Sequence, residues 1–390
     1  MVAAPVVRVS VKALRAGFEQ VFADLAAQGD VIWVEAGKQR FLLVNGAEQV
    51  HEVLVARSGE LVKPRSQAID TGPPRPERPP SMDVASFRRA LTAGLAARDD
   101  AGAAALRAAA ATETATWRDG AVVEVMPLLR RLSIAAAVRG AFASDLDGVS
   151  RQNLERVLRW FDDAPRVLPA SRFSSYSLRR VQMRAHLESV ATQLLANADR
   201  SQLSELDAVD GKPQLAAELL LGAVGPLAQT AGWLLHSFVT ERDEAARLRA
   251  EWPDLTRTLA FVREVTRLYP TNPRITRVAA VGTRVAGEHV PAATRVVLNV
   301  NAISRSARFY DEPDRLVADR WLGTRPDKLA YLSFGIGQRR CLGDTFALAT
   351  LTALLPALLA GWELRLDASA TTATGRHQLA EGTRGTVSVC

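Results

Sequence analysis

The sequence predicts a mainly helical α+β protein, in which a helix-rich body carries a small β-lobe. Ala/Leu/Arg-rich segments with helical spacing fill the middle of the chain, and short strand-like runs lie near both of its ends. Leu219 to Thr240 contains no charged residue, which is typical of a helix buried on all sides. We therefore expect the helices to pack around this central segment.

The composition is that of a globular protein. The chain has 390 residues, of which 48% are hydrophobic, enough to bury a large core, and we expect one domain over residues 1–390. The 49 basic residues barely exceed the 42 acidic ones, and no basic-aromatic cluster appears, so the net charge of +7 does not indicate nucleic-acid binding. It is better suited to attract an acidic protein partner.

The cysteines and the start of the chain bear on localisation. Cys341 and Cys390 are the two cysteines of the sequence and cannot form a disulfide framework, which favours a reducing compartment. Met1 to Lys12 contains no apolar run approaching the ~20 residues of a membrane anchor. We therefore expect a soluble, cytoplasmic protein.

The first 60 residues predict the β-lobe. A helix, two strands joined at Gly37-Lys38 and a second helix follow one another: Phe18–Gln28, Val31–Val34, Arg40–Val44 and Ala47–Val55. Asp70 to Pro80 then holds five prolines and cannot form regular structure. We expect it to be a loop within one domain, although a linker between domains is the alternative interpretation.

The body is predicted to be a stack of helices. Segments with helical spacing are Ala101–Thr116, Met126–Phe142, Arg151–Asp163, Ser177–Ala198 and Trp252–Leu268. Pro165 to Phe173 interrupts them. Strands are expected within Arg274–Ala286, Glu288–Leu298, Trp362–Leu366 and Thr386–Val389, with a further helix over Asp344–Leu359.

One cysteine lies in a setting that favours metal ligation. Cys341 sits in a Gly-rich turn, follows Arg339 and Arg340, and precedes the helix predicted from Asp344. A helix N-terminus and nearby guanidinium groups stabilise a thiolate, which is the form that binds metal. No second Cys or His stands at metal spacing, which argues against zinc and iron–sulfur clusters. Haem brings its own four nitrogens and needs a single axial ligand.

The same turn resembles a family signature. Five residues match the F-x-x-G-x-R-x-C-x-G haem-ligand motif of the cytochrome P450 family at every fixed position: Phe334, Gly337, Arg339, Cys341 and Gly343. For an isolated cysteine, a buried residue in an ordinary turn is the simpler interpretation, but five matched positions weigh against it. The resemblance implies the helix-rich P450 fold, haem b as cofactor and Cys341 as the iron ligand.

A second element resembles the E-x-x-R motif of this family. Glu264 and Arg267 stand three apart on the predicted helix and are followed by Leu268-Tyr269-Pro270. By itself such a pair is an ordinary surface ion pair. The resemblance implies instead a buried network that supports the cysteine loop and includes an arginine from a later loop, which we expect to be Arg315.

The resemblance also implies arginines at the haem propionates. Arg277 and Arg339 are at the matching places, and Arg88 and Arg89 begin a helical stretch where relatives carry further cations. Arginine matches a carboxylate with two parallel hydrogen bonds, which explains the residue type. An arginine pair on a solvated helix face is the alternative for Arg88 and Arg89.

The central helix departs from the family. The segment Gly222 to Pro226 aligns with a stretch that usually reads A/G-G-x-D/E-T, so Gly225 stands at the acid position and Pro226 at the alcohol position. The side chains that usually relay protons are therefore missing, and Gln229 and Thr230, one turn on, are the nearest polar candidates. Proline also removes a helical N–H, so we expect a kink.

The resemblance implies an oxidoreductase, and three interpretations remain open. The first is a monooxygenase that hydroxylates a small apolar natural product, such as a terpenoid or polyketide, with dioxygen and electrons from a ferredoxin or flavodoxin and its reductase. The second is a P450 that uses peroxide, or that couples or desaturates its substrate. The third is a haem-binding protein without turnover, which the complete cysteine loop and the Glu264/Arg267 pair disfavour.

Overall fold

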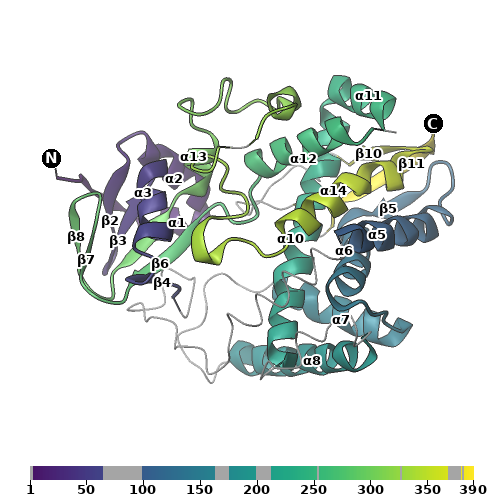
Figure 1. The fold of residues 1–390 in the computed structure, drawn as a ribbon, viewed down its shortest axis with the longest axis horizontal. Helices are drawn as coiled ribbons and strands as arrows, with labels where there is room; N and C mark the ends of the chain where they lie inside the picture. The colour runs from purple at the N-terminus through teal and green to yellow at the C-terminus, as the bar shows by residue number, and fades with distance from the viewer. Residues whose placement is uncertain are drawn as a thin grey trace.

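The computed structural model describes residues 3–64, 99–162, 175–198, 212–252, 254–325, 327–367, 379 and 382–390. The proline-rich segment Asp70–Pro80, the pair Arg88-Arg89 and the interruption at Pro165–Phe173 lie outside the described residues. In Figure 1 the β-lobe, which contains the N-terminus, occupies one side of the molecule and the helical body the other. The last long helix runs between them.

The helical body agrees with the predicted segments. It comprises α5 (Asp99–Thr114), α6 (Val125–Phe142), α7 (Gly148–Asp162), α8 (Ser175–Asn197), α10 (Lys212–Thr240), α11 (Arg242–Glu251), α12 (Thr256–Leu268) and α14 (Asp344–Leu359). The sequence pattern missed α11 because its charged residues give no apolar stripe, and Leu248 is the one side chain of this helix that is buried.

The β-lobe is built on a six-stranded sheet. Its order is β1 (Val6–Val9), β2 (Val31–Ala36), β3 (Gln39–Val44), β9 (Arg295–Leu298), β6 (Ile275–Ala279) and β4 (Leu61–Val62). The predicted hairpin is the antiparallel pair β2–β3, and β3 continues into a parallel pair with the distant β9. The sheet therefore joins the start of the chain to the segment that follows α12.

Short elements complete the lobe and the connections. Helices α1 (Val11–Ala16), α2 (Phe18–Ala26), α3 (Ala47–His51) and α13 (Val300–Ser304) belong to it, with a π-helical turn η1 (Glu52–Ala56) directly after α3. The remaining elements are β5 (Val122–Glu124), β7 (Thr283–Val285), β8 (Glu288–Val290), β10 (Trp362–Leu366), β11 (Arg384–Val389), η3 (Ala318–Trp321) and η4 (Gly337–Arg339). Strands β10, β11 and β5 form a separate small sheet beside the helices.

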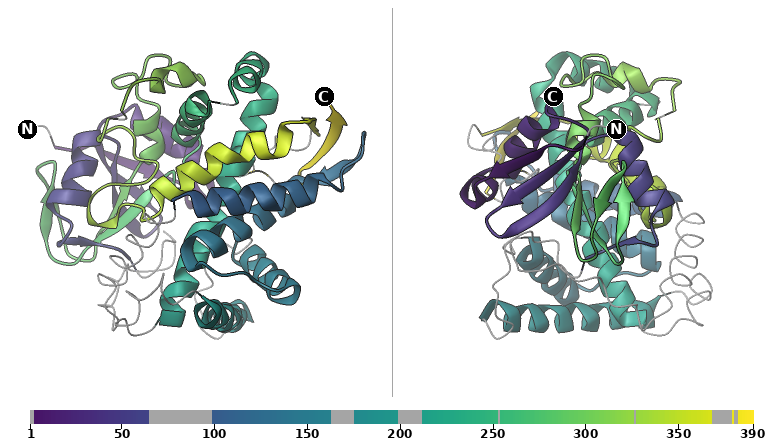
Figure 2. Two further views of the ribbon diagram at one scale, coloured as in Figure 1. Left: turned by 45° about the vertical axis from the view of Figure 1, so that its right-hand side comes forward. Right: turned by 90° about the vertical axis from the view of Figure 1, so that its left-hand side faces the viewer.

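Helix α10 is the centre of the body. By length and composition it is apolar enough to cross a membrane, but 61% of its apolar window is buried inside the protein. It packs against α6, α8, α12 and α14, and the left view of Figure 2 shows it running through the molecule behind α14. The helix remains continuous through Pro226. Its apolarity therefore reflects burial in a protein core.

The ring of Phe346 restricts the position of α14. Phe346, in its first turns, lies where side chains are missing on two neighbouring helices, at Gly102 of α5 and Gly140 of α6. A Cβ atom at Gly102 would stand 2.0 Å from Cε2 of Phe346, and one at Gly140 would stand 2.3 Å from the same atom. Because the ring is enclosed from both sides, α14 has little freedom to slide.

Substitution of Gly140 tests whether the ring of Phe346 is tightly enclosed. Gly140→Ala adds a methyl group that the enclosed ring cannot avoid, so we expect the free energy of unfolding to fall by ~1–3 kcal/mol, as in overpacked cores. Urea unfolding measures the change. The control is Gly148→Ala in the first turn of α7, where a Cβ meets nothing within 4 Å. Equal free energies of unfolding for Gly140→Ala and Gly148→Ala would contradict a tight enclosure of the Phe346 ring.

Candidate functional site

The cysteine loop lies between η4 and α14. The backbone N–H of Cys341 donates to the carbonyl of Phe334 over 2.8 Å, which closes the loop on itself. Gly335 and Gly337 have φ of 67° and 72°, in the left-handed region that side chains disfavour. Cys341 itself is exposed, three residues before α14 begins. The fold thus presents a thiol beside a helix N-terminus.

The β-lobe forms one wall of this loop. A Cβ atom at Gly337 would stand 2.5 Å from the carbonyl oxygen of Leu54 and 3.3 Å from Cγ2 of Val55. Both of these residues belong to the π-helical turn η1. The glycine at this position of the motif is therefore required twice, by its positive φ and by the close approach of the η1 backbone.

A buried ion network lies on α12. Both carboxylate oxygens of Glu264 accept from Arg267, at 2.8 Å from Nε and 2.7 Å from Nη2, and neither side chain is exposed to solvent. Arg267 Nη1 also donates to the carbonyls of Ser304 and Pro313. The pair therefore links α12 to the segment after α13.

Glu264 accepts three further hydrogen bonds. The donors are the backbone N–H of Val317 at 2.9 Å, Nε of Arg320 at 3.0 Å and Nε1 of Trp321 at 2.9 Å. Burial by itself raises the pKa of Glu264, but the hydrogen bonds and charges of Arg267 and Arg320 outweigh it, and the pKa stays below its usual value. The buried carboxyl group is therefore ionised at neutral pH.

The expectation for Arg315 was wrong. Its side chain is 70% exposed and pairs with Glu312, and it contributes to the network only through its carbonyl, which accepts from Arg267. The second arginine on Glu264 is Arg320, in η3. Both arginines follow an aspartate, in Asp314-Arg315 and in Asp319-Arg320. The sequence differs in that Trp321 follows Arg320, and its indole N–H is a further donor to the carboxylate of Glu264.

Helix α10 has an open face in the middle of its length. Gly222 is exposed, and a Cβ there would meet nothing within 4 Å, while Pro226 and Gln229, on the same side of the helix, are partly exposed. Thr230 is buried, and its hydroxyl donates to the carbonyl of Pro226 over 2.9 Å. The hydroxyl proton of Thr230 is therefore already engaged.

The predictions of arginines at the haem propionates remain untested. Arg277 is on β6, opposite Val296 of β9, and its Nη1 donates to the carbonyl of Thr276 over 3.0 Å. The side chain of Arg339 is not among those that the structure describes, and Arg88 and Arg89 lie outside the described residues. A role of these arginines at propionate groups stays a prediction.

The observed features fit a haem cofactor with one protein ligand. An exposed thiol can serve as the single axial ligand of a haem iron, and the exposed Gly222 leaves room for a flat group beside α10. Among the described residues, no three His, Cys, Asp or Glu side chains stand close enough to hold a metal ion on their own. A metal at Cys341 would accordingly have to bring other ligands with it, as haem does.

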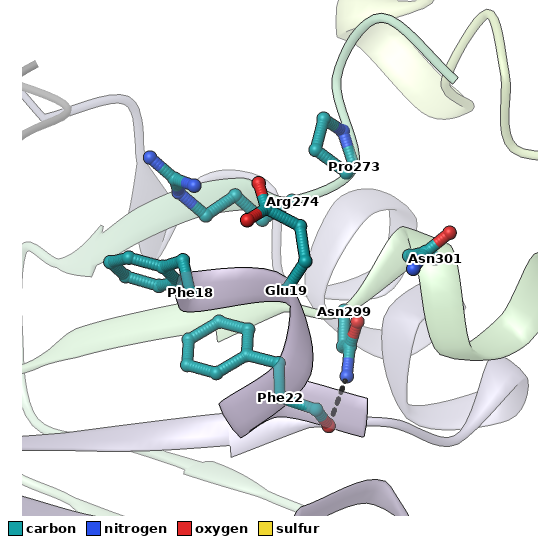
Figure 3. Close-up of a pocket in the computed structure, with 7 residues that line it drawn as sticks. All are labelled: Phe18, Glu19, Phe22, Pro273, Arg274, Asn299 and Asn301. Carbon is teal, nitrogen blue, oxygen red and sulfur yellow. Dashed lines mark hydrogen bonds between the residues drawn. The ribbon is translucent and has the colours of Figure 1, made fainter. Parts of the chain in front are cut away.

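A hollow in the β-lobe is separate from this site. Figure 3 shows it at the start of α2, where Phe18 and Phe22 face Arg274 and Asn299. Asn299 donates to the carbonyl of Phe22 and to the side chain of Asn45, so its amide serves to hold α2 on the sheet. None of the predicted site residues lines this hollow.

Comparisons with known proteins agree with this geometry. The family model described as Cytochrome P450 matches residues 192–378. Pentalenene oxygenase of Streptomyces avermitilis is 26% identical over 312 residues, which cover 68% of each chain. Cyclooctat-9-en-7-ol 5-monooxygenase of Streptomyces melanosporofaciens is 25% identical over 399 residues, covering 89% of this chain and 85% of the relative.

The fold is also that of a solved P450. Cytochrome P450EX alpha, determined with myristic acid, matches with a TM-score of 0.77 over the full length of both chains, at 13% sequence identity. The chain belongs to the cytochrome P450 family, and it is a P450 monooxygenase of the bacterial type with a haem-iron cofactor. The predictions of family, fold class and enzyme class are confirmed.

Arg320 and Arg315 make a matched pair of test positions. Arg320→Met removes one of two cations from a buried carboxylate, so we expect it to lower the free energy of unfolding by ~2–3 kcal/mol, somewhat less than the ~3–5 kcal/mol for a fully unpaired ion. Arg315→Met breaks an exposed ion pair, for which about 0.5 kcal/mol is expected. Urea unfolding of both variants measures the difference, and similar losses would contradict the corrected network.

Proposed function

We propose that this enzyme is a haem b monooxygenase that hydroxylates a cyclic terpenoid, with Cys341 as the proximal iron ligand. The observation that carries the proposal is the exposed thiol of Cys341 in a closed, glycine-dependent loop at the start of α14. One haem domain spans residues 1–390 in this proposal, and the enzyme works in the cytoplasm.

The residues of the chain have distinct tasks around the cofactor. Haem supplies the oxygen-activating redox chemistry, and a thiolate ligand donates electron density that favours O–O cleavage. Cys341 would hold the iron, with Phe334, Gly337 and Gly343 shaping its loop. Arg277 and Arg339, and also Arg88 and Arg89, would bind the propionate groups, since a guanidinium group matches a carboxylate.

The supporting network has no part in the chemistry. Glu264 and Arg267 are fully buried, Arg320 is 14% exposed, and the three satisfy one another, so they act by fixing the segment between α13 and η3. Arg315 adds its carbonyl from the surface. Their contribution to turnover is therefore indirect, through the position of the cysteine loop.

The proposed substrate and partner follow from relatives and charge. Two relatives are named for pentalenene and for cyclooctat-9-en-7-ol, which supports a terpenoid. The chain carries a net charge of +7, which suits an acidic electron donor such as a ferredoxin or flavodoxin with its own reductase. Electrons would arrive on the side of Cys341.

Proton delivery is the unusual part of this site. Gly225 and Pro226 have no acidic or hydroxyl group, and the Thr230 hydroxyl donates to the carbonyl of Pro226. Gln229 is the polar side chain on the open face of α10, and an amide is a weak proton donor. A water chain or a hydroxyl group of the substrate would then supply the protons. The same observation favours peroxide, which already carries the two protons and two electrons, as an alternative oxidant.

Replacement of the cysteines tests the ligand. Cys341→Ser should abolish the thiolate-type Soret band of the reduced carbon monoxide complex, because a serine oxygen cannot supply the thiolate sulfur. Cys390→Ser is the matched control and should leave the band unchanged, since Cys390 is the other exposed cysteine of the sequence. Survival of the band in Cys341→Ser would refute the assignment.

Restoring the missing pair tests proton delivery. In Gly225→Asp/Pro226→Thr, an acid and a hydroxyl return to α10, and positioned proton donors accelerate the step they serve by ~10²–10⁴-fold. We expect the ratio of product formed to NAD(P)H consumed to rise several-fold with terpenoids that lack hydroxyl groups. Gly225→Asn/Pro226→Val has the same shape without the acid or hydroxyl and should show no gain. The proposal is excluded if the wild type already forms nearly one product per NAD(P)H consumed and Gly225→Asp/Pro226→Thr does not raise this ratio.

A further inference from the structure

Thr266 of α12 makes contacts that neither the ion network nor the P450 motifs explain. Its Oγ1 lies 2.7 Å from the hydroxyl of Tyr331, and its carbonyl accepts from the hydroxyl of Ser333 over 2.9 Å. Tyr331 to Phe334 is the segment that leads into the cysteine loop. One residue of α12 is therefore bonded twice to this lead-in segment, through its side chain and through its backbone.

The direction of the side-chain bond can be assigned. A threonine hydroxyl has one proton, and Thr266 donates it to the carbonyl of Arg263 over 2.9 Å. Tyr331 must then be the donor to Thr266. Burial raises the pKa of Tyr331 to about 12, so its phenol keeps the proton at neutral pH. Thr266 is itself buried, which makes loss of either partner costly.

These bonds fix the atom that closes the cysteine loop. Ser333 immediately precedes Phe334, whose carbonyl accepts the N–H of Cys341 over 2.8 Å. Leu332, between the two anchored side chains, is buried in the core of the β-lobe, and its carbonyl accepts from Gly335. The carbonyl of Phe334 thus has little room to move while Tyr331 and Ser333 are bound to Thr266.

We propose that Thr266, Tyr331 and Ser333 form a lead-in clamp that holds the cysteine loop in the geometry in which the sulfur can bind iron. The three are positioning residues, since they act through Phe334 and Cys341. The proposal rests on the assigned role of Cys341. Without the clamp the Phe334 carbonyl, which accepts the N–H of Cys341, gains freedom to move, and the position of the sulfur becomes less defined.

The hydrogen bonds of the clamp are separate from those of the Glu264 network, although both use α12 and the ring of Tyr331 lies 5.3 Å from that of Trp321. Glu264 and Arg267 bind the segment from Ser304 to Trp321, whereas Thr266 binds the segment just before the cysteine loop. A variant of the clamp therefore leaves the buried charges paired. This allows the position of the loop to be perturbed with less risk of unfolding the protein.

A double-mutant cycle of Thr266→Val and Tyr331→Phe tests the clamp. Both changes remove a hydroxyl from the same hydrogen bond, so their effects should not add. The first readout is the lifetime of the thiolate-type Soret band of the reduced carbon monoxide complex, which each single variant should shorten by about three- to tenfold, as the loss of one buried hydrogen bond implies. The double variant should be no worse than the more affected single one.

The second readout needs no haem. In a Cys390→Ser background, the rate of alkylation of Cys341 in the haem-free protein reports the freedom of the loop, and both clamp variants should raise it by a similar factor. Thr266→Ser keeps the hydroxyl and should restore wild-type values in both measurements. Thr240→Val is the matched control, because it removes a hydroxyl that donates to the carbonyl of His236 at the end of α10.

The outcomes separate the clamp from the ligand assignment. A wild type without a thiolate-type band would overturn Cys341 as ligand, while the alkylation rates would still decide the clamp. If Thr266→Val and Tyr331→Phe lower only the unfolding temperature, as Thr240→Val does, and leave band lifetime and alkylation rate unchanged, the clamp is refuted. Additive effects of the two substitutions would also refute it, since they would then act at separate contacts.

Discussion

The carboxylate of Glu264 is the point on which the arrangement of this site depends. A fully buried charge is tolerated only when its hydrogen-bonding capacity is satisfied, and here the donors come from three parts of the chain: Arg267 on α12, the backbone of Val317, and Arg320 with Trp321 in η3. Distant segments must assemble together before the charge is stabilised. The network therefore fixes α12 relative to the connection that precedes the cysteine loop.

The cysteine loop is held from both sides of the molecule. The β-lobe contributes the η1 backbone, which approaches Gly337 too closely for any side chain. The helical body contributes the enclosed ring of Phe346 at the start of α14, and α12 contributes Thr266. Each of these contacts comes from a different element. The position of Cys341 therefore depends on how η1, α14 and α12 pack together, although its thiol is exposed.

The open face of α10 carries Gly222, Pro226 and Gln229. Gly222 leaves the middle of α10 open, and Pro226 has no N–H to donate to the carbonyl one turn earlier. The expected consequence, a kink, does not interrupt the helix, which continues to Thr240. We propose accordingly that water, substrate or oxidant supplies the protons, because Gly225 and Pro226 replace the acid and the alcohol of the usual family pattern.

The sequence by itself determined the elements and the chemistry that depend on short-range patterns. Helical spacing predicted α14 at its observed bounds, and two β-branched runs predicted the hairpin β2–β3. The motif around Cys341 indicated a haem cofactor through its resemblance to the cytochrome P450 family. Only the tertiary structure decided between Arg315 and Arg320, because both follow an aspartate and differ in which one the fold brings to Glu264. The contacts of Thr266 with Tyr331 and of Gly337 with Leu54 could not be predicted from the sequence either. Their partners are distant in the chain, and no periodicity links them. Local sequence sets which groups are present, and the packing of distant segments sets which of them meet.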